Sequence, residues 1–143
     1  MEFELEINKI LNTIKVRDIK TFEDMNKNIE SILDIVYKDY LKYDRNRVHL
    51  ENAKKKLLNN YEYVEIIDDI NEGDSLIAID LSRFYNMRVQ HIGFCVKKIS
   101  DTCIRTINLK RVFNYSCINR IFFRKLSSSD KAKVMLIETI GDL

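Results

Sequence analysis

The chain has 143 residues, of which 24 are Lys or Arg and 22 are Asp or Glu, with no Pro, no Trp and only three Gly. With 45% apolar and 32% charged residues, the composition is that of a globular protein and excludes collagen-like, coiled-coil and disulfide-based frameworks. The length suits one domain, or two small units that share a core.

The first half of the chain has the spacing of amphipathic helices. Apolar residues recur every three or four positions over residues 3–14, which places them on one helical stripe. A second series over residues 22–40 keeps this period for about five turns. Thr21 and Asp24 precede it in the pattern of a capping box. A third helix is expected over residues 44–61.

After residue 62 the apolar residues are β-branched or aromatic and are separated by turn residues, which favours strands. Gly93 lies within a strand pattern and indicates a bulge or a close approach of two backbones. Ser127 and Asp130 then open a short helix that ends at Gly141. The five predicted strands are Tyr63–Ile67, Leu76–Asp80, Arg88–Lys98, Cys103–Leu109 and Ile118–Lys125.

Helices followed by short strands predict an α+β fold. We expect N-terminal helices, then a small five-stranded antiparallel β-meander or barrel of the SH3-like or OB-like kind, and a short C-terminal helix. The chain divides accordingly into an acidic helical region, residues 1–62, and a basic β-rich region with the C-terminal helix, residues 63–143.

The near-balance of charge hides a strong asymmetry along the chain. Residues 1–70 carry 12 basic and 15 acidic side chains, whereas residues 71–143 carry 12 basic and 7 acidic ones. Between residues 82 and 126 ten cations face a single acid, Asp101. The ten, which we predict to be partner- or phosphate-binding residues, are Arg83, Arg88, Lys97, Lys98, Arg105, Lys110, Arg111, Arg120, Arg124 and Lys125.

Aromatic residues are interleaved with these cations. Nucleic-acid binders need cations to neutralise phosphates, and single-strand binders add aromatic rings on which bases stack. The alternative is that the aromatics form the core, while the cations protect strand edges or pair with the acidic helices. The aromatics concerned are Phe84, Tyr85, Phe94, Phe113, Tyr115, Phe122 and Phe123.

The alternation of side chains along a strand refines this interpretation. Ile92, Phe94 and Val96 share the more apolar face of their strand and are expected to face the core. In the next strand Arg105 shares its face with apolar neighbours such as Ile107. An arginine in that position either extends along an edge to reach water or meets the anion of a partner.

Gly73-Asp74-Ser75-Leu76 spells the signature of the GDSL esterases, in which the Ser is a nucleophile that needs a His base. The downstream His91 follows Arg88-Val89-Gln90, so an Arg stands where that family offers an Asp. The chain is also short for that α/β fold and lacks its alternating strands and helices. A turn between two strands explains the same residues, and no catalytic residue is predicted.

Zinc ligation is the other chemistry to weigh. His91, Cys95, Cys103 and Cys117 are potential ligands, but zinc ligands usually come in closely spaced pairs such as Cys-x2–4-Cys. An extended chain would separate His91 from Cys95 by roughly 13 Å, at about 3.3 Å per residue. The cysteines are better explained as small core residues. The sequence therefore predicts no metal site, no cofactor and no enzyme.

The N-terminus alternates acidic with apolar residues, which fits neither a secretory signal nor a transit peptide. No apolar run approaches the roughly 18 residues that cross a bilayer. Three cysteines without a signal are expected to be free thiols in a reducing compartment. We expect a virion, or the cytoplasm or nucleus of a host cell, and neither secretion nor a membrane partner.

Three stretches, Gly73–Asp80, His91–Ile99 and Phe122–Leu126, together resemble the β-rich region of short proteins from large nucleocytoplasmic DNA viruses. Ile, Lys and Asn, all with A/T-rich codons, supply 48 of the 143 residues, which agrees with such an origin. The resemblance covers about half of the chain and includes no catalytic motif. It implies a small virion-associated, minor capsid or transcription-accessory protein without enzymatic activity.

Two hypotheses follow. The first is a small non-enzymatic viral structural or assembly protein, which contacts other virion or complex proteins and turns its basic β face toward an acidic partner. The second is a nucleic-acid-binding accessory factor, for transcription or genome packaging, which uses the same face on DNA or RNA. The sequence leaves the partner's identity and the oligomeric state open.

Overall fold

The structure, a computed structural model, describes residues 21–141 of the chain. Helix α2 (Phe22–Tyr37) continues into a 3-10 turn (Lys38–Tyr40), helix α3 (Asp44–Leu57) follows, and helix α4 (Ser128–Gly141) is the last element. The helical stripe predicted over residues 3–14 lies outside the described residues. Between α3 and α4 lie β1 (Tyr61–Val64), a 3-10 turn (Ile67–Asp69), β2 (Ser75–Asp80), β3 (Val89–Ser100), β4 (Cys103–Asn108), β5 (Arg111–Ser116) and β6 (Arg120–Lys125).

The predicted helix caps are present. At the start of α2, the hydroxyl of Thr21 accepts a hydrogen bond from the backbone N–H of Asp24 at 3.1 Å. At the start of α4, the backbone N–H of Asp130 donates to the Ser127 hydroxyl at 3.0 Å, and the N–H of Ser127 donates to the Asp130 carboxylate at 3.3 Å. Both caps satisfy amides that have no partner within the helix.

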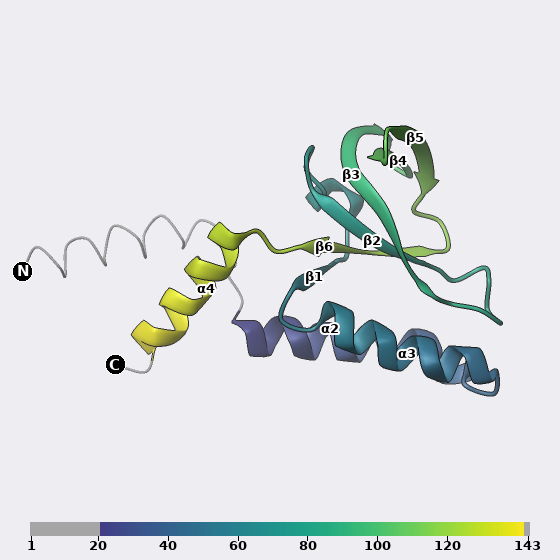
Figure 1. Cartoon of the computed structure of the whole chain (residues 1–143), viewed down its shortest axis with the longest axis horizontal. Helices are drawn as coiled ribbons and strands as arrows, with labels where there is room; N and C mark the ends of the chain where they lie inside the picture. The colour runs from purple at the N-terminus through teal and green to yellow at the C-terminus, as the bar shows by residue number, and fades with distance from the viewer. Residues whose placement is uncertain (1–20, 142–143) are drawn as a thin grey trace, which may run out of the picture.

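The six strands form one antiparallel sheet in the order β1-β6-β2-β3-β4-β5 (Figure 1). The predicted α+β class, with helices before the strands and a short helix after them, is confirmed. The prediction of five strands is wrong, and so is the meander, because β6 returns to lie between β1 and β2. The sheet does not close into a barrel, so β1 and β5 remain edge strands.

The strand that the sequence pattern did not reveal is β5. It pairs with β4 across a two-residue turn formed by Leu109 and Lys110, which have positive φ angles of 49° and 67°. Turns of this kind usually carry Asn or Gly at both positions, since other residues are strained there. Leu-Lys therefore gave no turn signal, although the pairing begins directly beside it, at Asn108 and Arg111.

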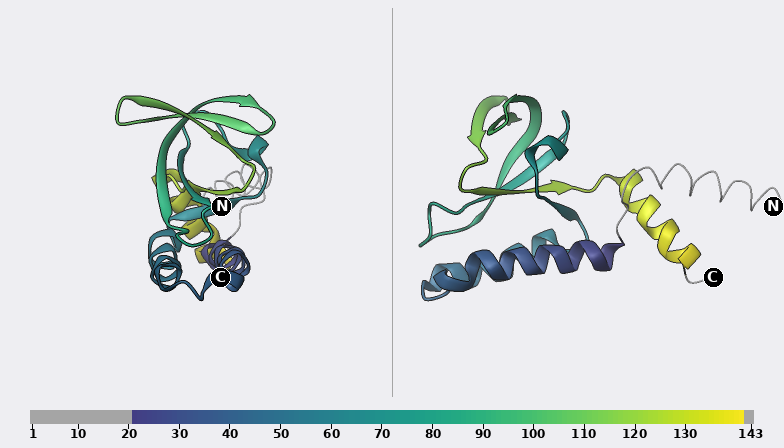
Figure 2. Two further views of the ribbon diagram at one scale, coloured as in Figure 1. Left: turned by 90° about the vertical axis from the view of Figure 1, so that its right-hand side faces the viewer. Right: turned by 180° about the vertical axis from the view of Figure 1, so that it is seen from behind.

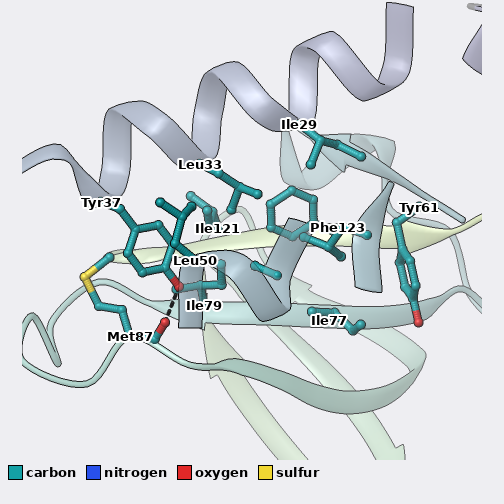
Figure 3. Packing of buried hydrophobic residues seen from close by; sticks show 12 residues of the cluster. Ile29, Leu33, Tyr37, Leu50, Tyr61, Ile77, Ile79, Met87, Ile121 and Phe123 are labelled. Carbon is teal, nitrogen blue, oxygen red and sulfur yellow. Dashed lines mark hydrogen bonds between the residues drawn. The ribbon is translucent and has the colours of Figure 1, made fainter. Parts of the chain in front are cut away.

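Helices α2 and α3 lie side by side across one face of β1, β6 and β2 (Figure 2). Ile29, Leu33 and Tyr37 of α2 point onto Ile79 and Phe123 of the sheet, and all five side chains are fully buried (Figure 3). Each large apolar side chain buried in this way stabilises the fold by about 1.5–3 kcal/mol. The helical half and the β-rich half thus share a hydrophobic core.

The opposite face of the sheet curls around a second core. Because of the curl, β4 and β5 lie at the end of the molecule opposite α2 and α3 (Figure 1). The buried side chains of this second core are Val64, Ile70, Leu76, Ala78, Ile92, Cys95, Ile104 and Phe122.

Gly93 allows the curl. Its φ of +94° is a conformation that side chains rarely adopt, and the pairing between β2 and β3 shifts by one residue beside it. A Cβ atom at this position would lie 2.1 Å from the carbonyl oxygen of Ile107 in β4. The predicted bulge and close backbone approach are therefore both present.

The same bulge overturns one sequence prediction. Ile92, Phe94 and Val96 were expected to face the core together, but only Ile92 is buried. The extra residue at the bulge reverses the alternation, so Cys95 is buried and Phe94 and Val96 are exposed. A second register shift, between Cys95 and Lys97, follows in the pairing with β4.

Helix α4 packs through Val134 against Met25 and Leu126, in a small cluster of its own. The carboxylate of Glu138 accepts a hydrogen bond at 3.0 Å from the backbone N–H of Phe22. The start of α2 is thereby joined to the end of the described chain.

We expect Gly93→Ala to destabilise the protein far more than Gly73→Ala, which is a matched control. Gly73 has nearly the same φ, +90°, but nothing lies within 4 Å of a Cβ built there. Gly73→Ala should therefore cost only the backbone strain, about 1–2 kcal/mol. Gly93→Ala should cost about 1–3 kcal/mol more, since its methyl group meets the β4 backbone. Equal unfolding free energies for the two variants in urea titrations would contradict the close approach.

Candidate partner-binding surfaces

The structure distributes the ten predicted cations over three places. Arg83, Arg88 and Arg120 line a pocket at one end of the curled sheet. Arg124 and Lys125 lie at the end of β6. The other five, Lys97, Lys98, Arg105, Lys110 and Arg111, lie on β3, β4, β5 and the turn between β4 and β5.

Arg124 is occupied by contacts within the protein. Its guanidinium group forms an ion pair with Glu62 of β1 and another, at 3.5 Å, with Asp74 before β2. It also donates to the backbone carbonyl of Asp69 at 3.0 Å. Burial raises the pKa of Asp74, against the hydrogen bond that it accepts from Asn71. Arg124 therefore joins the strands at this end of the sheet through contacts within the protein.

The exposed side of β3, β4 and β5 carries an apolar row. Phe94, Ile107 and Val112 lie opposite one another on the three strands and have exposed fractions of 55%, 39% and 60%. They belong to the sheet face that α2 and α3 cover at β2, but the helices do not reach this far. Large side chains left open to water in a contiguous row are typical of contact surfaces.

Cations border this row. Lys97 and Arg105 form the adjacent cross-strand pair, and Nε of Arg105 donates to the side chain of Asn114 at 3.1 Å. The turn beside the row carries Lys110 and Arg111, both exposed. We call the surface formed by Phe94, Lys97, Arg105, Ile107 and Val112 the outer face. Arg105 thus shares a face with Ile107, as its place in the sequence predicted.

Lys98 is not part of the outer face, because its ammonium group donates to the backbone carbonyl of Asp68 at 3.0 Å.

The aromatic residues singled out in the sequence are divided between the cores and the surface. Phe122 and Phe123 are buried in the two cores, whereas Phe84, Tyr85, Phe94 and Phe113 are exposed and Tyr115 is half-buried.

The pocket at the end of the sheet is lined by Asp80, Arg83, Asn86, Arg88, Gln90, Tyr115 and Arg120, and has a volume of about 260 Å³. We call it the arginine pocket. Arg120 is held in place by a 3.6 Å ion pair with Asp80, a 3.1 Å hydrogen bond to the Ser116 carbonyl and the Tyr115 ring, whose centroid is 5.5 Å away. Among residues 21–141, no carboxylate forms an ion pair with Arg83 or Arg88.

Asp80 is the one acid in the lining of this pocket. Burial opposes its ionisation, but two hydrogen bonds from Ser82 and the charges of Arg120 and Arg83 outweigh burial and lower its pKa. Asp80 is therefore ionised at neutral pH. With three arginines and this one carboxylate, the lining of the pocket has a net charge of about +2.

The loop between β2 and β3, residues 81–88, carries Arg83 and Arg88 and is held by both long helices. The buried side chain of Asn46 in α3 donates to the carbonyl of Phe84 at 2.6 Å and accepts from the N–H of Met87 at 2.8 Å. The buried hydroxyl of Tyr37 in α2 donates to the carbonyl of Met87 (Figure 3). Nothing in the sequence marked Asn46 as an anchor, because a lone Asn in a helix is usually exposed.

His49 adds a further contact to this loop, since its Nε2 lies 2.6 Å from the side-chain oxygen of Asn86. The sequence did not assign it a partner.

The residues that resemble the GDSL esterase motif lie on two neighbouring strands. Ser75 is on β2 and His91 is on β3, where it lies opposite Ile77. No hydrogen bond joins them among the described residues.

The cysteines remain separate. Cys95 is buried and Cys103 and Cys117 are half-buried, and all three are free thiols. Burial raises the pKa of the Cys95 thiol, with the charges of Asp74 and Glu72 acting in the same direction. Within residues 21–141, no three His, Cys, Asp or Glu side chains gather in a way that could hold a metal ion.

Comparison with known proteins gives no match to a family model, a curated protein or a solved structure. Of the helices between residues 21 and 141, none combines the length and the apolar character needed to cross a membrane.

We expect Asn46→Ala to loosen the loop that carries Arg83 and Arg88. The change removes the hydrogen bond to the Phe84 carbonyl and leaves the buried N–H of Met87 without this partner, which should cost about 1–3 kcal/mol. Trypsin, which cuts after arginine, should then cleave at the two loop arginines sooner than in the unaltered protein. Asn52→Ala, on an exposed position of α3, is the matched control. If the two variants unfold and are cleaved alike, Asn46 is not the anchor.

Proposed function

We propose that the protein is a small non-enzymatic structural or assembly protein that acts by protein–protein contact, with the outer face turned toward an acidic partner. The observation that carries this proposal is the apolar row of Phe94, Ile107 and Val112, open to water and bordered by Lys97 and Arg105. An apolar centre with a charged border is the usual anatomy of a protein interface.

The edge of the sheet supports the same proposal. β5 is the last strand in the sheet, so one side of its backbone is unpaired among the described residues. An extended segment of a partner can add to such an edge as a further strand. In a strand, apolar side chains on the outer face would continue the row, while the alternate acidic side chains would point to the opposite face, on which Arg111 lies.

A second copy of this chain fits the edge less well. Two copies of β5 side by side would bring Lys110 and Arg111 of both copies into one interface, to which β5 itself contributes no acid. Like charges gathered in one interface weaken it. An acidic partner gains from the same charges.

A nucleic acid is the alternative partner, and the exposed aromatic residues favour it. Phe84 and Tyr85 are exposed on the same loop as Arg83 and Arg88, which combines rings for stacking with cations for phosphate. The outer face itself fits this role less well, because Ile107 and Val112 offer no ring to a base.

We further propose a virion, or an assembly intermediate of one, as the setting. This part rests on the resemblance of residues 73–80, 91–99 and 122–126 to proteins of large DNA viruses. Other virion proteins would then supply the acidic segment.

The outer face can be tested with a fluorescein-labelled peptide of alternating Glu and Val. We expect saturable binding, and a loss of affinity of about tenfold or more in Val112→Glu, since the change removes an apolar contact and repels the acidic peptide. Ile35→Glu is the matched control, because Ile35 is equally exposed, at 66%, on the far side of the molecule. A peptide of alternating Lys and Val should not bind.

Fluorescence anisotropy, which follows binding of the labelled peptide, also separates the two candidate partners. For this purpose labelled single- and double-stranded DNA and RNA are titrated with the protein at several salt concentrations. Binding through phosphate contacts predicts that log K falls by about 0.9 per neutralised phosphate for each unit of log salt on duplex DNA. Nucleic-acid binding with such a slope, together with no binding of the Glu-Val peptide, would contradict the proposal and favour the alternative.

A further inference from the structure

The arginine pocket is a second site, separate from the outer face. Tyr115 and Arg120 line it from the inner side of β5 and β6, whereas Val112 and Asn114 lie on the outer side of β5. Its chemistry can therefore be considered independently of the apolar row.

We propose that the arginine pocket binds a phosphate monoester group. Arg83, Arg88 and Arg120 together line a space of about 260 Å³, which is large enough for a phosphoryl group and the atoms next to it. Guanidinium groups present planar pairs of N–H donors that match phosphate oxygens in geometry and charge. Gln90 and Asn86 add amide donors, and Tyr115 adds a hydroxyl group.

The charge of the pocket favours a dianion. With Asp80 ionised, the lining carries three positive charges and one negative charge. A phosphate monoester carries a charge of about −1.5 to −2 at neutral pH and matches this excess. A phosphodiester or a carboxylate carries one negative charge and would leave part of the excess uncompensated.

Two parts of the pocket, the Arg120 side chain and the backbone of the loop, are fixed before any ligand arrives. Arg120 is fixed by Asp80, by the Ser116 carbonyl and by the ring of Tyr115. The loop that carries Arg83 and Arg88 is tied to α3 through Asn46 and closed by a 2.9 Å hydrogen bond from the Asn86 N–H to the Arg83 carbonyl. Donors held in place lose less entropy on binding, which raises affinity.

Among residues 21–141, no ion pair holds Arg83 or Arg88, although the charge of Arg83 acts on Asp80. Arg124 shows the contrast, because it forms ion pairs with a carboxylate on β1 and with another just before β2. Arg83 and Arg88 lie on an exposed loop and line the same pocket as Arg120, and the single charge of Asp80 offsets only part of the repulsion among the three cations. A bound phosphate group would remove that repulsion.

Calorimetric titration of the full chain tests the proposal, with chloride adjusted to hold the ionic strength constant. The ligands are inorganic phosphate, O-phosphoserine as a monoester, and dimethyl phosphate as a diester. We expect saturable binding of phosphate and phosphoserine, and dimethyl phosphate binding weaker by about tenfold or more. Phosphoserine binding tighter than inorganic phosphate would identify a phosphorylated side chain as the source, and the reverse would identify the free ion.

Arg88→Gln and Arg83→Gln remove one donor group each from exposed loop positions, and each should weaken phosphoserine binding about tenfold. Lys97→Gln on the outer face is the matched control and should leave it unchanged. The two proposals fail separately, because Val112→Glu should spare phosphoserine binding and Arg88→Gln should spare binding of the Glu-Val peptide. The proposal would be overturned if neither phosphate nor phosphoserine bound more tightly than chloride. It would also be overturned if Lys97→Gln lost as much phosphoserine affinity as Arg88→Gln, or if dimethyl phosphate bound as tightly as phosphoserine.

Discussion

The hydrogen bonds of one buried amide, that of Asn46, connect the helical half of the molecule to the part of the sheet that carries charge. Asn46 bonds to Phe84 and Met87, and Tyr37 bonds to Met87 from the neighbouring helix. These contacts order a loop that has no regular secondary structure. Ordering such a loop costs conformational entropy, and the hydrogen bonds offset part of this cost. Because the loop carries Arg83 and Arg88, the geometry of the arginine pocket depends on side chains of α2 and α3.

A second constraint, at Gly93, separates the two surfaces of the sheet. The close approach of Gly93 to the backbone of β4 lets the sheet curl around its own inner core. The inner side then ends in the arginine pocket, and the outer side presents the apolar row away from the helices. A flat sheet would expose a whole apolar face, which is a hazard for aggregation, whereas the curl encloses the second core and leaves the apolar row of the outer face open.

Local patterns in the sequence predicted the local features of the fold. The caps at Thr21 and Ser127 and the bulge at Gly93 follow from short stretches of residues, and the structure contains all three. The strand β5 was missed because its turn uses Leu109 and Lys110, whose strained conformations the surrounding pairing must impose. The place of β6 between β1 and β2 depends on pairing across the whole chain, for which the sequence carries no short-range signal.

The candidate sites were predictable in composition but not in arrangement. The ten cations were identified from charge alone. Their contacts differ, however, because these depend on residues that are distant in the sequence. Arg124 pairs with Glu62, 62 positions away, while Arg83, Arg88 and Arg120 line one pocket because the sheet curls and the loop is anchored. The exposure of Phe94 follows from the bulge, since strict alternation would have buried it.

The most direct test of the outer face is backbone hydrogen exchange of the full chain with and without the Glu-Val peptide. If a partner strand adds to the open edge, the amides of β5 that point away from β4 should become protected on binding, while those of α2 and α3 exchange as before. Protection that appears on the helices, or peptide binding that leaves β5 exchanging at its free rate, would contradict an interface at this edge of the sheet.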